Sequence, residues 1–178
     1  TRTVDVTVAG DEVVEVDETI TLTLSNPTGT DVVIGDATGS GTINNDDQAT
    51  VTIADVAVNE NSGTATITLT LDNAVDGGFS VDVSTADGTA TTADGDYSSV
   101  TAATETFAGT ASETETLTVT LGGDTKVEGD ETVTISMATL MPPTVDASDI
   151  DITDTGTLTL NNDDAATVTI ADVAVNEN

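Results

Sequence analysis

The sequence has no cysteine, no histidine and no tryptophan, and its only basic side chains are Arg2 and Lys126. Without cysteine or histidine it can form no disulfide, no zinc or iron–sulfur site, and no imidazole base or thiolate nucleophile. Two basic residues against 33 acidic ones give a formal net charge of −31. That balance excludes the basic surface that nucleic acids and anionic membranes require, so we expect neither partner.

Two further absences narrow the range of possible functions. No apolar run approaches the roughly 20 residues that span a bilayer, so we expect no membrane insertion in this segment. Aromatic residues make up 2% of the chain. A pair of carboxylates could hydrolyse glycosides, but that chemistry needs a substrate cleft, and aromatic walls for a sugar are missing. We therefore expect no enzyme activity.

The residues that are present indicate a folded protein. Hydrophobic residues make up 37% of the chain, the mean hydropathy is +0.02, and the apolar residues follow a pattern. A disordered acidic chain would be poorer in apolar residues. An ordered protein of this charge must bring many carboxylates close together, and the question is what balances them.

An internal repeat organises the chain. Residues 44–61 read NNDDQATVTIADVAVNEN, and residues 161–178 differ from them at one position, Gln48 against Ala165. VDVTVAGDEVVEVDETITL from Val4 likewise resembles LTVTLGGDTKVEGDETVTI from Leu117. The two pairs are offset by 117 and 113 positions, and either period is the size of one β-sandwich domain. The difference between the two offsets indicates a four-residue insertion, which we place around residues 141–143.

The repeat predicts three parts of the chain. We expect residues 1–47 to be the C-terminal part of one repeat, 48–164 a complete repeat, and 165–178 the N-terminal strand of a third. The repeats meet at NNDD without a flexible spacer, which favours stiff junctions. We accordingly expect this sequence to be a window of a longer covalent array.

Apolar residues alternate with threonine at a period of two, which is typical of half-buried strands. We expect one continuous strand over residues 50–58 and others over 63–71, 117–121, 132–135, 155–160 and 20–24. Turn sequences rich in Gly, Asn and Asp separate these runs, and a longer loop is expected over 141–148, where two prolines occur. The prediction is an all-β protein of tandem, immunoglobulin-like antiparallel β-sandwiches.

Acidic residues gather at the strand ends and in the loops. Two carboxylates 4 Å apart repel by about 1 kcal/mol in water and about 4 kcal/mol at an effective dielectric of 20. Several of them at one end of a small domain would therefore destabilise it strongly. Ca²⁺ accepts six to eight oxygen ligands from irregular loops, whereas Mg²⁺ prefers fewer carboxylates and more water. Calcium is the expected cofactor.

Four sequence elements, in order, resemble a Calx-beta repeat: VNENSGT from Val58, STADGTATTADGDY from Ser84, VEGDET from Val127 and the closing NNDD. Calx-beta modules occur in sodium–calcium exchangers, an integrin subunit and large bacterial surface proteins. The resemblance implies a seven-strand immunoglobulin-like sandwich that can bind Ca²⁺ at one end, near the next module.

The resemblance also implies the metal ligands. In the complete repeat these are Glu60, Asp96, Asp124, Glu128, Glu131, Asp163 and Asp164. In the partial repeats they are Asp11, Glu15, Glu18, Asp46, Asp47 and Glu177. The sequence departs from well-occupied family sites at Gly123, Thr125 and Asn162, where the family often has aspartate, so we expect one to three ions per repeat.

Several acids have simpler interpretations. Asp87 precedes a glycine, and turn formation explains it without metal. Lys126 lies among acids and is expected to pair with one of them. Most other carboxylates, such as Asp5 and Asp82, are expected to be solvated surface charges.

Together these features predict a calcium-binding structural segment of a long extracellular bacterial surface protein, such as a stalk, adhesin or filament. Calcium would stiffen the junctions between neighbouring repeats, and chains could self-assemble into filaments. The alternatives are a calcium-sensing regulatory domain and a carbohydrate- or protein-binding module.

Overall fold

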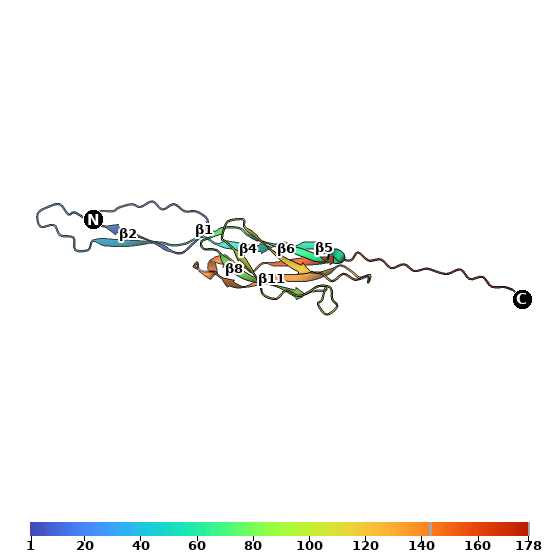
Figure 1. Cartoon of the computed structure of the whole chain (residues 1–178). Coiled ribbons are helices and arrows are strands. Elements are labelled where there is room, and N and C mark those ends of the chain that lie inside the picture. The colour runs from blue at the N-terminus through green and yellow to red at the C-terminus, as the bar shows by residue number, and fades with distance from the viewer. Residues whose placement is uncertain (143, 178) are drawn as a thin grey trace.

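The computed structural model describes residues 1–142 and 144–177. The molecule is elongated, with a two-stranded hairpin region at one end, a sandwich in the middle and an extended C-terminal segment at the other end (Figure 1). No helix among these residues is long and apolar enough to cross a membrane.

The N-terminal part contains β1 (Val13–Val14), β2 (Glu18–Thr23) and β3 (Thr38–Ile43). The central part contains β4 (Ala49–Ile53), β5 (Val56–Asn59), η1 (Glu60–Ser62), β6 (Thr64–Leu71), β7 (Ala74–Val75), β8 (Phe79–Asp87), β9 (Ala103–Phe107), β10 (Thr114–Thr120), β11 (Glu131–Met141), η2 (Ala147–Asp149), β12 (Ile150–Asp151) and β13 (Thr155–Asn161).

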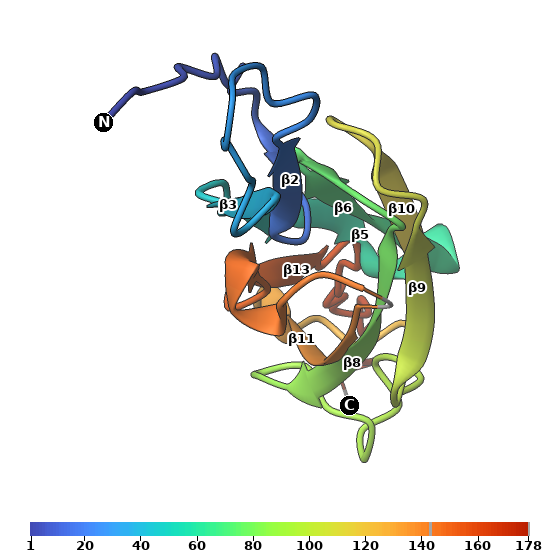
Figure 2. The same ribbon diagram turned by 90° about the vertical axis from the view of Figure 1, so that its left-hand side faces the viewer.

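Two sheets form the central sandwich. One has the order β10-β6-β4-β12 and the other the order β5-β13-β11-β8-β9. Figure 2 looks along the long axis and shows β6 and β10 across from β8, β11 and β13. In β6, Ala65, Ile67, Leu69 and Leu71 are buried and the threonines between them point outward, as the period of two predicts. The all-β sandwich is therefore confirmed.

The prediction of one continuous strand over residues 50–58 is wrong. β4 and β5 belong to opposite sheets, and the chain crosses between them at Ala54 and Asp55. Hydrogen bonds from distant residues hold the crossing: Ile53 N–H donates to Asp154 Oδ2 (2.8 Å), and Thr157 N–H donates to Asp55 Oδ1 (2.7 Å). Gly156 allows this approach, since a Cβ there would lie 2.4 Å from Cγ2 of Ile53.

The crossing also changes the pairing of the strands. β4 pairs in parallel with β12, and β5 pairs in parallel with β13. The other pairings within the two sheets are antiparallel. The sandwich is thus mainly antiparallel with parallel pairs where β4 and β5 enter it.

The loop predicted over residues 141–148 begins later than expected. β11 continues to Met141, with a register shift against β8 between Ala138 and Met141. Thr139 lies in this irregular stretch and has a φ of 52°. The 3₁₀ turn η2 follows, and Pro143 lies outside the described residues.

The N-terminal part adds one residue to the core of the central sandwich. β2 and β3 form an antiparallel hairpin whose apolar residues Ile20 and Leu22 are exposed. β1, in contrast, pairs in parallel with β7 of the central part, and its Val14 is fully buried there. Residues 165–177 at the other end contain no helix or strand.

Candidate metal centre

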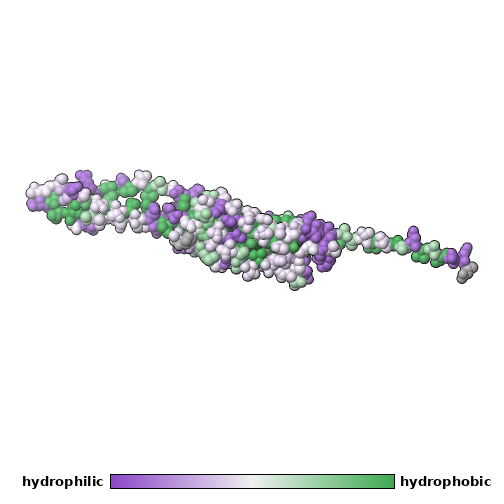
Figure 3. Space-filling view, viewed as in Figure 1, coloured by the Kyte–Doolittle hydropathy of each residue, from purple (hydrophilic) through white to green (hydrophobic). Residues whose placement is uncertain are grey.

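Three carboxylates converge at the end of the sandwich beside the C-terminal segment. Glu60 opens η1 directly after β5, Asp124 lies in the loop between β10 and β11, and Asp164 follows β13. One oxygen of each lies within 4.8 Å of one oxygen of the other two. Hydrophilic residues gather over this end of the molecule (Figure 3). The sequence places these acids 40 or more positions apart, and the sandwich brings them together.

Two oxygens of this cluster are buried without a partner. Glu60 Oε1 and Asp164 Oδ2 have no hydrogen-bond donor among the described residues. Burial raises the pKa of the Glu60 carboxyl, and the nearby Asp164 carboxylate raises it further. The charges of Asp124 and Asp163 act in the same direction. A buried, unpaired acceptor facing a second carboxylate is costly unless a cation or a proton lies between them.

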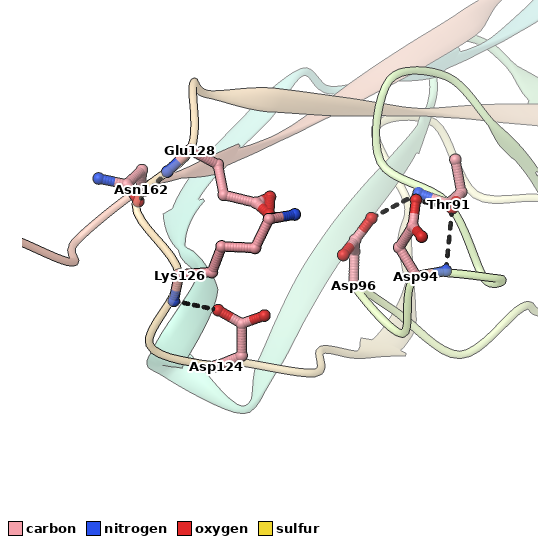
Figure 4. Close-up of polar contacts among 7 residues, drawn as sticks. All are labelled: Thr91, Asp94, Asp96, Asp124, Lys126, Glu128 and Asn162. Carbon is pink, nitrogen blue, oxygen red and sulfur yellow. Dashed lines mark hydrogen bonds and ion pairs between the residues drawn. The ribbon is translucent and has the colours of Figure 1, made fainter.

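A second acidic group lies on the neighbouring loops. Burial raises the pKa of the Glu131 carboxyl, and the nearby charges of Asp96 and Glu128 raise it further, while Lys126 lowers it. Lys126 forms an ion pair with Glu128, as expected of the single lysine. Asp96 Oδ2 accepts a hydrogen bond from Thr91 N–H (2.7 Å), which fixes the β8–β9 loop (Figure 4).

Backbone contacts join the loop of Asp96 to the loop of Asp124. Tyr97 and Leu121 form an isolated β-bridge, and Gly122 N–H donates to the Asp96 carbonyl (2.8 Å). A Cβ at Gly122 would lie 1.9 Å from the Gly95 carbonyl oxygen. The loops that carry the two acidic groups are therefore joined through their backbones.

Asn162 forms three hydrogen bonds that hold the chain around Asp164, and we call this arrangement the asparagine frame. Its Oδ1 accepts from Glu128 N–H (3.0 Å), its Nδ2 donates to the Asp164 carbonyl (3.1 Å), and its N–H donates to Asp130 Oδ1 (3.1 Å). Figure 4 shows Asn162 beside Glu128 in this arrangement. An aspartate here could not donate to the Asp164 carbonyl. Asn162 therefore holds the loop in place of the carboxylate that the family often has.

Gly123, the second departure from the family pattern, also has a structural role. A Cβ at this position would lie 2.1 Å from Oδ1 of Asn61. Asn61 in turn donates from Nδ2 to Asp163 Oδ1 (2.7 Å). The glycine thus lets the loop of Asp124 approach η1 closely enough for Asp124 and Glu60 to meet.

The first repeat has a corresponding asparagine frame, built around Asn45. Asn45 Oδ1 accepts from Glu15 N–H (3.2 Å), Asn45 Nδ2 donates to the Asp47 carbonyl (3.1 Å), and Asn45 N–H donates to Asp17 Oδ1 (2.9 Å). These are the counterparts of the three hydrogen bonds of Asn162. The sequence signal was available, because both asparagines belong to the NNDD motif.

The predicted ligands of the first repeat gather at the junction with the central sandwich. Burial raises the pKa of Glu15, and the charges of Glu18, Asp11, Asp76 and Asp47 raise it further. The pKa of Asp47 is raised by burial and then by the charges of its neighbours, which are Asp46, Asp11 and Glu12. Glu177, the predicted ligand of the third repeat, lies exposed in the extended segment.

The junction contains acids that were not among the predicted ligands. Asp76 follows β7 of the central part, and its charge helps to raise the pKa of Glu15 in the first repeat. Asp149, in η2, accepts a hydrogen bond from Asn45 Nδ2 (3.3 Å). A cleft between the two parts is lined by Glu15, Val16, Asp17, Asn45, Thr144, Val145, Asp146 and Asp149.

The comparisons with known proteins agree with this fold. A Calx-beta domain family model matches residues 1–57 and 44–174. These matches span most of the sequence, and the chain belongs to the Calx-beta family. No curated protein sequence matches it.

Solved structures with a similar fold include the apo-form Calx CBD1 domain, at 18% identity and a TM-score of 0.52 over 66% of this chain and 100% of that chain. CBD12 from CALX1.2 has 18% identity and a TM-score of 0.52 over 65% of this chain and 44% of that chain. The calcium binding domain CBD12 of CALX1.1 has 19% identity and a TM-score of 0.52 over 66% and 47%. The chain spans less than half of the last two, and at these identities the likeness establishes the fold.

Proposed function

We propose that this chain is a calcium-binding structural segment of an extracellular bacterial surface protein, in which Ca²⁺ stiffens the junctions between Calx-beta repeats. One observation carries the proposal: Glu60 and Asp164 each have a buried, unpartnered carboxylate oxygen, and their carboxylates converge with that of Asp124. Family membership supports a binding or structural module over an enzyme.

The donors at the site fit a hard cation. Glu60, Asp124 and Asp164 offer carboxylate oxygens from three separate elements, and the chain has no histidine or cysteine that would favour zinc or copper. Ca²⁺ suits several carboxylates in an irregular, loop-built arrangement better than Mg²⁺ does. When bound, the ion would offset the repulsion that raises the pKa of Glu60.

The position of the acids supports a role at the junctions. One acidic group lies where residues 165–177 leave the sandwich, and another lies where the first repeat enters it. Cations at both places would couple each domain end to the chain that follows. Extracellular modules bind Ca²⁺ at about 10⁻⁴–10⁻³ M, which suits a surface protein.

Isothermal titration of Ca²⁺ into the full chain tests the site. We expect one to three ions for the complete repeat, and Glu60→Gln should weaken the tightest of them by about tenfold or more. Asp5→Asn removes the same charge from an exposed position and serves as the matched control. Equal affinities for the two variants would contradict the assignment.

Two measurements test the finer parts of the proposal. Small-angle scattering of the full chain should show a longer maximum dimension in Ca²⁺ than in EDTA, and unchanged dimensions would contradict the stiffening role. Antibodies against the chain should label intact cells of the source organism if the protein is on the surface. Labelling only after lysis would contradict that location.

A further inference from the structure

The junction between the first repeat and the central sandwich is a shared apolar core. Val13 and Val14 of β1 pair in parallel with Ala74 and Val75 of β7, and Asp76 N–H donates to the Val14 carbonyl (2.8 Å). Val14 is 0% exposed and belongs to the core of the central sandwich. A residue of one repeat thus completes the core of the next.

The central repeat has a valine at the corresponding position at its other end. Val127 is the counterpart of Val14, 113 positions further along the chain. Each follows an aspartate that holds the turn: Val13 N–H donates to Asp11 Oδ1 (3.0 Å), and Lys126 N–H donates to Asp124 Oδ1 (2.7 Å). Both frames are also held by their asparagines, Asn45 and Asn162, so the backbone presents the two valines in the same way.

The two valines differ in what covers them. Val127 is 51% exposed, against 0% for Val14. The receiving strand for Val14, β7, lies 26 positions after Gln48, the first residue of its repeat. The third repeat begins at Ala165 with the same sequence as the second apart from that first residue, but its counterpart of β7 would lie after residue 178.

We propose that Lys126 and Val127 form a docking strand for the repeat that follows, whose turn equivalent to Ala74–Asp76 closes over Val127 as β7 closes over Val14. The occupant is therefore a segment of the same chain, a third Calx-beta repeat continuing from Asn178. Burial of a valine is non-polar and does not require a cation, so this inference does not rest on calcium binding.

The absence of cysteine from the chain allows a direct test by thiol labelling. Val14→Cys and Val127→Cys are made separately in the 178-residue chain and treated with a maleimide in EDTA. We expect Val127→Cys to react at least about tenfold faster, because the thiol at position 14 is reached only when the junction opens. Equal rates would overturn the shared core at the existing junction.

The chain is then extended after Asn178 by a copy of residues 62–164, which completes a third repeat with the sequence of the central one. In the extended chain, labelling of Val127→Cys should slow by about tenfold or more and approach the rate of Val14→Cys. An unchanged rate overturns the proposal. As a second readout, Val127→Ser should lower the melting temperature of the extended chain and leave that of the 178-residue chain unchanged; no shift in the extended chain would also contradict it.

Discussion

The central repeat and the C-terminal segment contain nearly the same sequence, which differs only at Gln48 against Ala165, in two different conformations. Residues 48–61 form β4, β5 and the start of η1, whereas residues 165–177 are extended and form no strand. Val51 is 0% exposed and its counterpart Val168 is 93% exposed. The alternation of apolar residues and threonine therefore marks a sequence that can become a strand, but β6, β12 and β13 provide the partners that make it one.

The first repeat lies between these extremes. Val6 is 53% exposed where its counterpart Val119 is 0% exposed, so its apolar face is largely uncovered. The pairing of β2 with β3 nevertheless has the same register as the pairing of β11 with β13 in the central repeat. The hydrogen bonds of Asn45 that correspond to those of Asn162 are also present. The asparagine frames thus depend on contacts within each repeat, whereas burial of the apolar residues requires the complete set of strands.

The largest difference between the two regions should appear on truncating core residues. Leu69→Ala removes a fully buried side chain of β6 and should destabilise the central sandwich by about 2–5 kcal/mol. Leu22→Ala, in the exposed hairpin, should change the same unfolding transition by less than about 0.5 kcal/mol. Urea unfolding of the full chain measures both, and similar effects would show that the hairpin shares the core.

The asparagine frame should contribute less than the core. Asn162→Ala removes the acceptor for Glu128 N–H and the donor to the Asp164 carbonyl, which should cost about 1–3 kcal/mol. Asn45→Ala removes the counterpart contacts in the first repeat and the longer hydrogen bond to Asp149 of the central part (3.3 Å), and it should affect the unfolding of the central sandwich less. A larger loss for Asn45→Ala in urea unfolding would reverse the roles that we assign to the two frames.

Glu113 offers a contrast with Glu60 within the central repeat. Burial opposes its ionisation, but N–H groups of Ala108, Gly109 and Thr110 donate to it at 2.8–3.1 Å and together lower its pKa. Its ionised form therefore stabilises the fold above the pKa of the unfolded chain, and this contribution is lost as the pH falls through the lowered folded-state pKa.

We expect Glu113→Gln to destabilise the chain by about 1–2 kcal/mol at neutral pH, with the difference shrinking as the pH falls below the ordinary carboxyl range. Melting curves from neutral to acidic pH check this, and exposed Glu12→Gln is the control. A difference that grows on acidification would contradict the direction of the pKa shift.

The smallest effect is expected in the C-terminal segment. Val168→Ser changes a side chain without a core around it and should leave the melting temperature within error of the parent chain. Val51→Ser, at the matching position of β4, should lower it by several degrees because it places a hydroxyl in the core. A clear shift for Val168→Ser would mean that the segment has a partner in solution.

The sequence predicted the strands where alternation was uninterrupted, as in β6 and β13. It did not predict the crossing from β4 to β5, because Ala54 and Asp55 continue the alternation. The crossing depends on Asp154 and Gly156, about 100 positions away. No local pattern carries that information.

The candidate site shows a similar division. Glu60, Asp124 and Asp164 were predicted ligands, and the structure brings them together, while their role in holding a metal stays a prediction. Asp76 and Asp149 were not among the predicted ligands, because they reach the first repeat from the next domain. Contacts across a junction leave no spacing signal within either repeat.

The most direct test of the calcium site is thermal unfolding of the full chain in EDTA and across a calcium titration. We expect the melting temperature to rise continuously with calcium, by an amount equivalent to about 2.7 kcal/mol at a hundred times Kd, and Glu60→Gln to flatten this rise. A melting temperature that does not change up to about 10 mM Ca²⁺, well above the affinity of extracellular modules, would contradict the account.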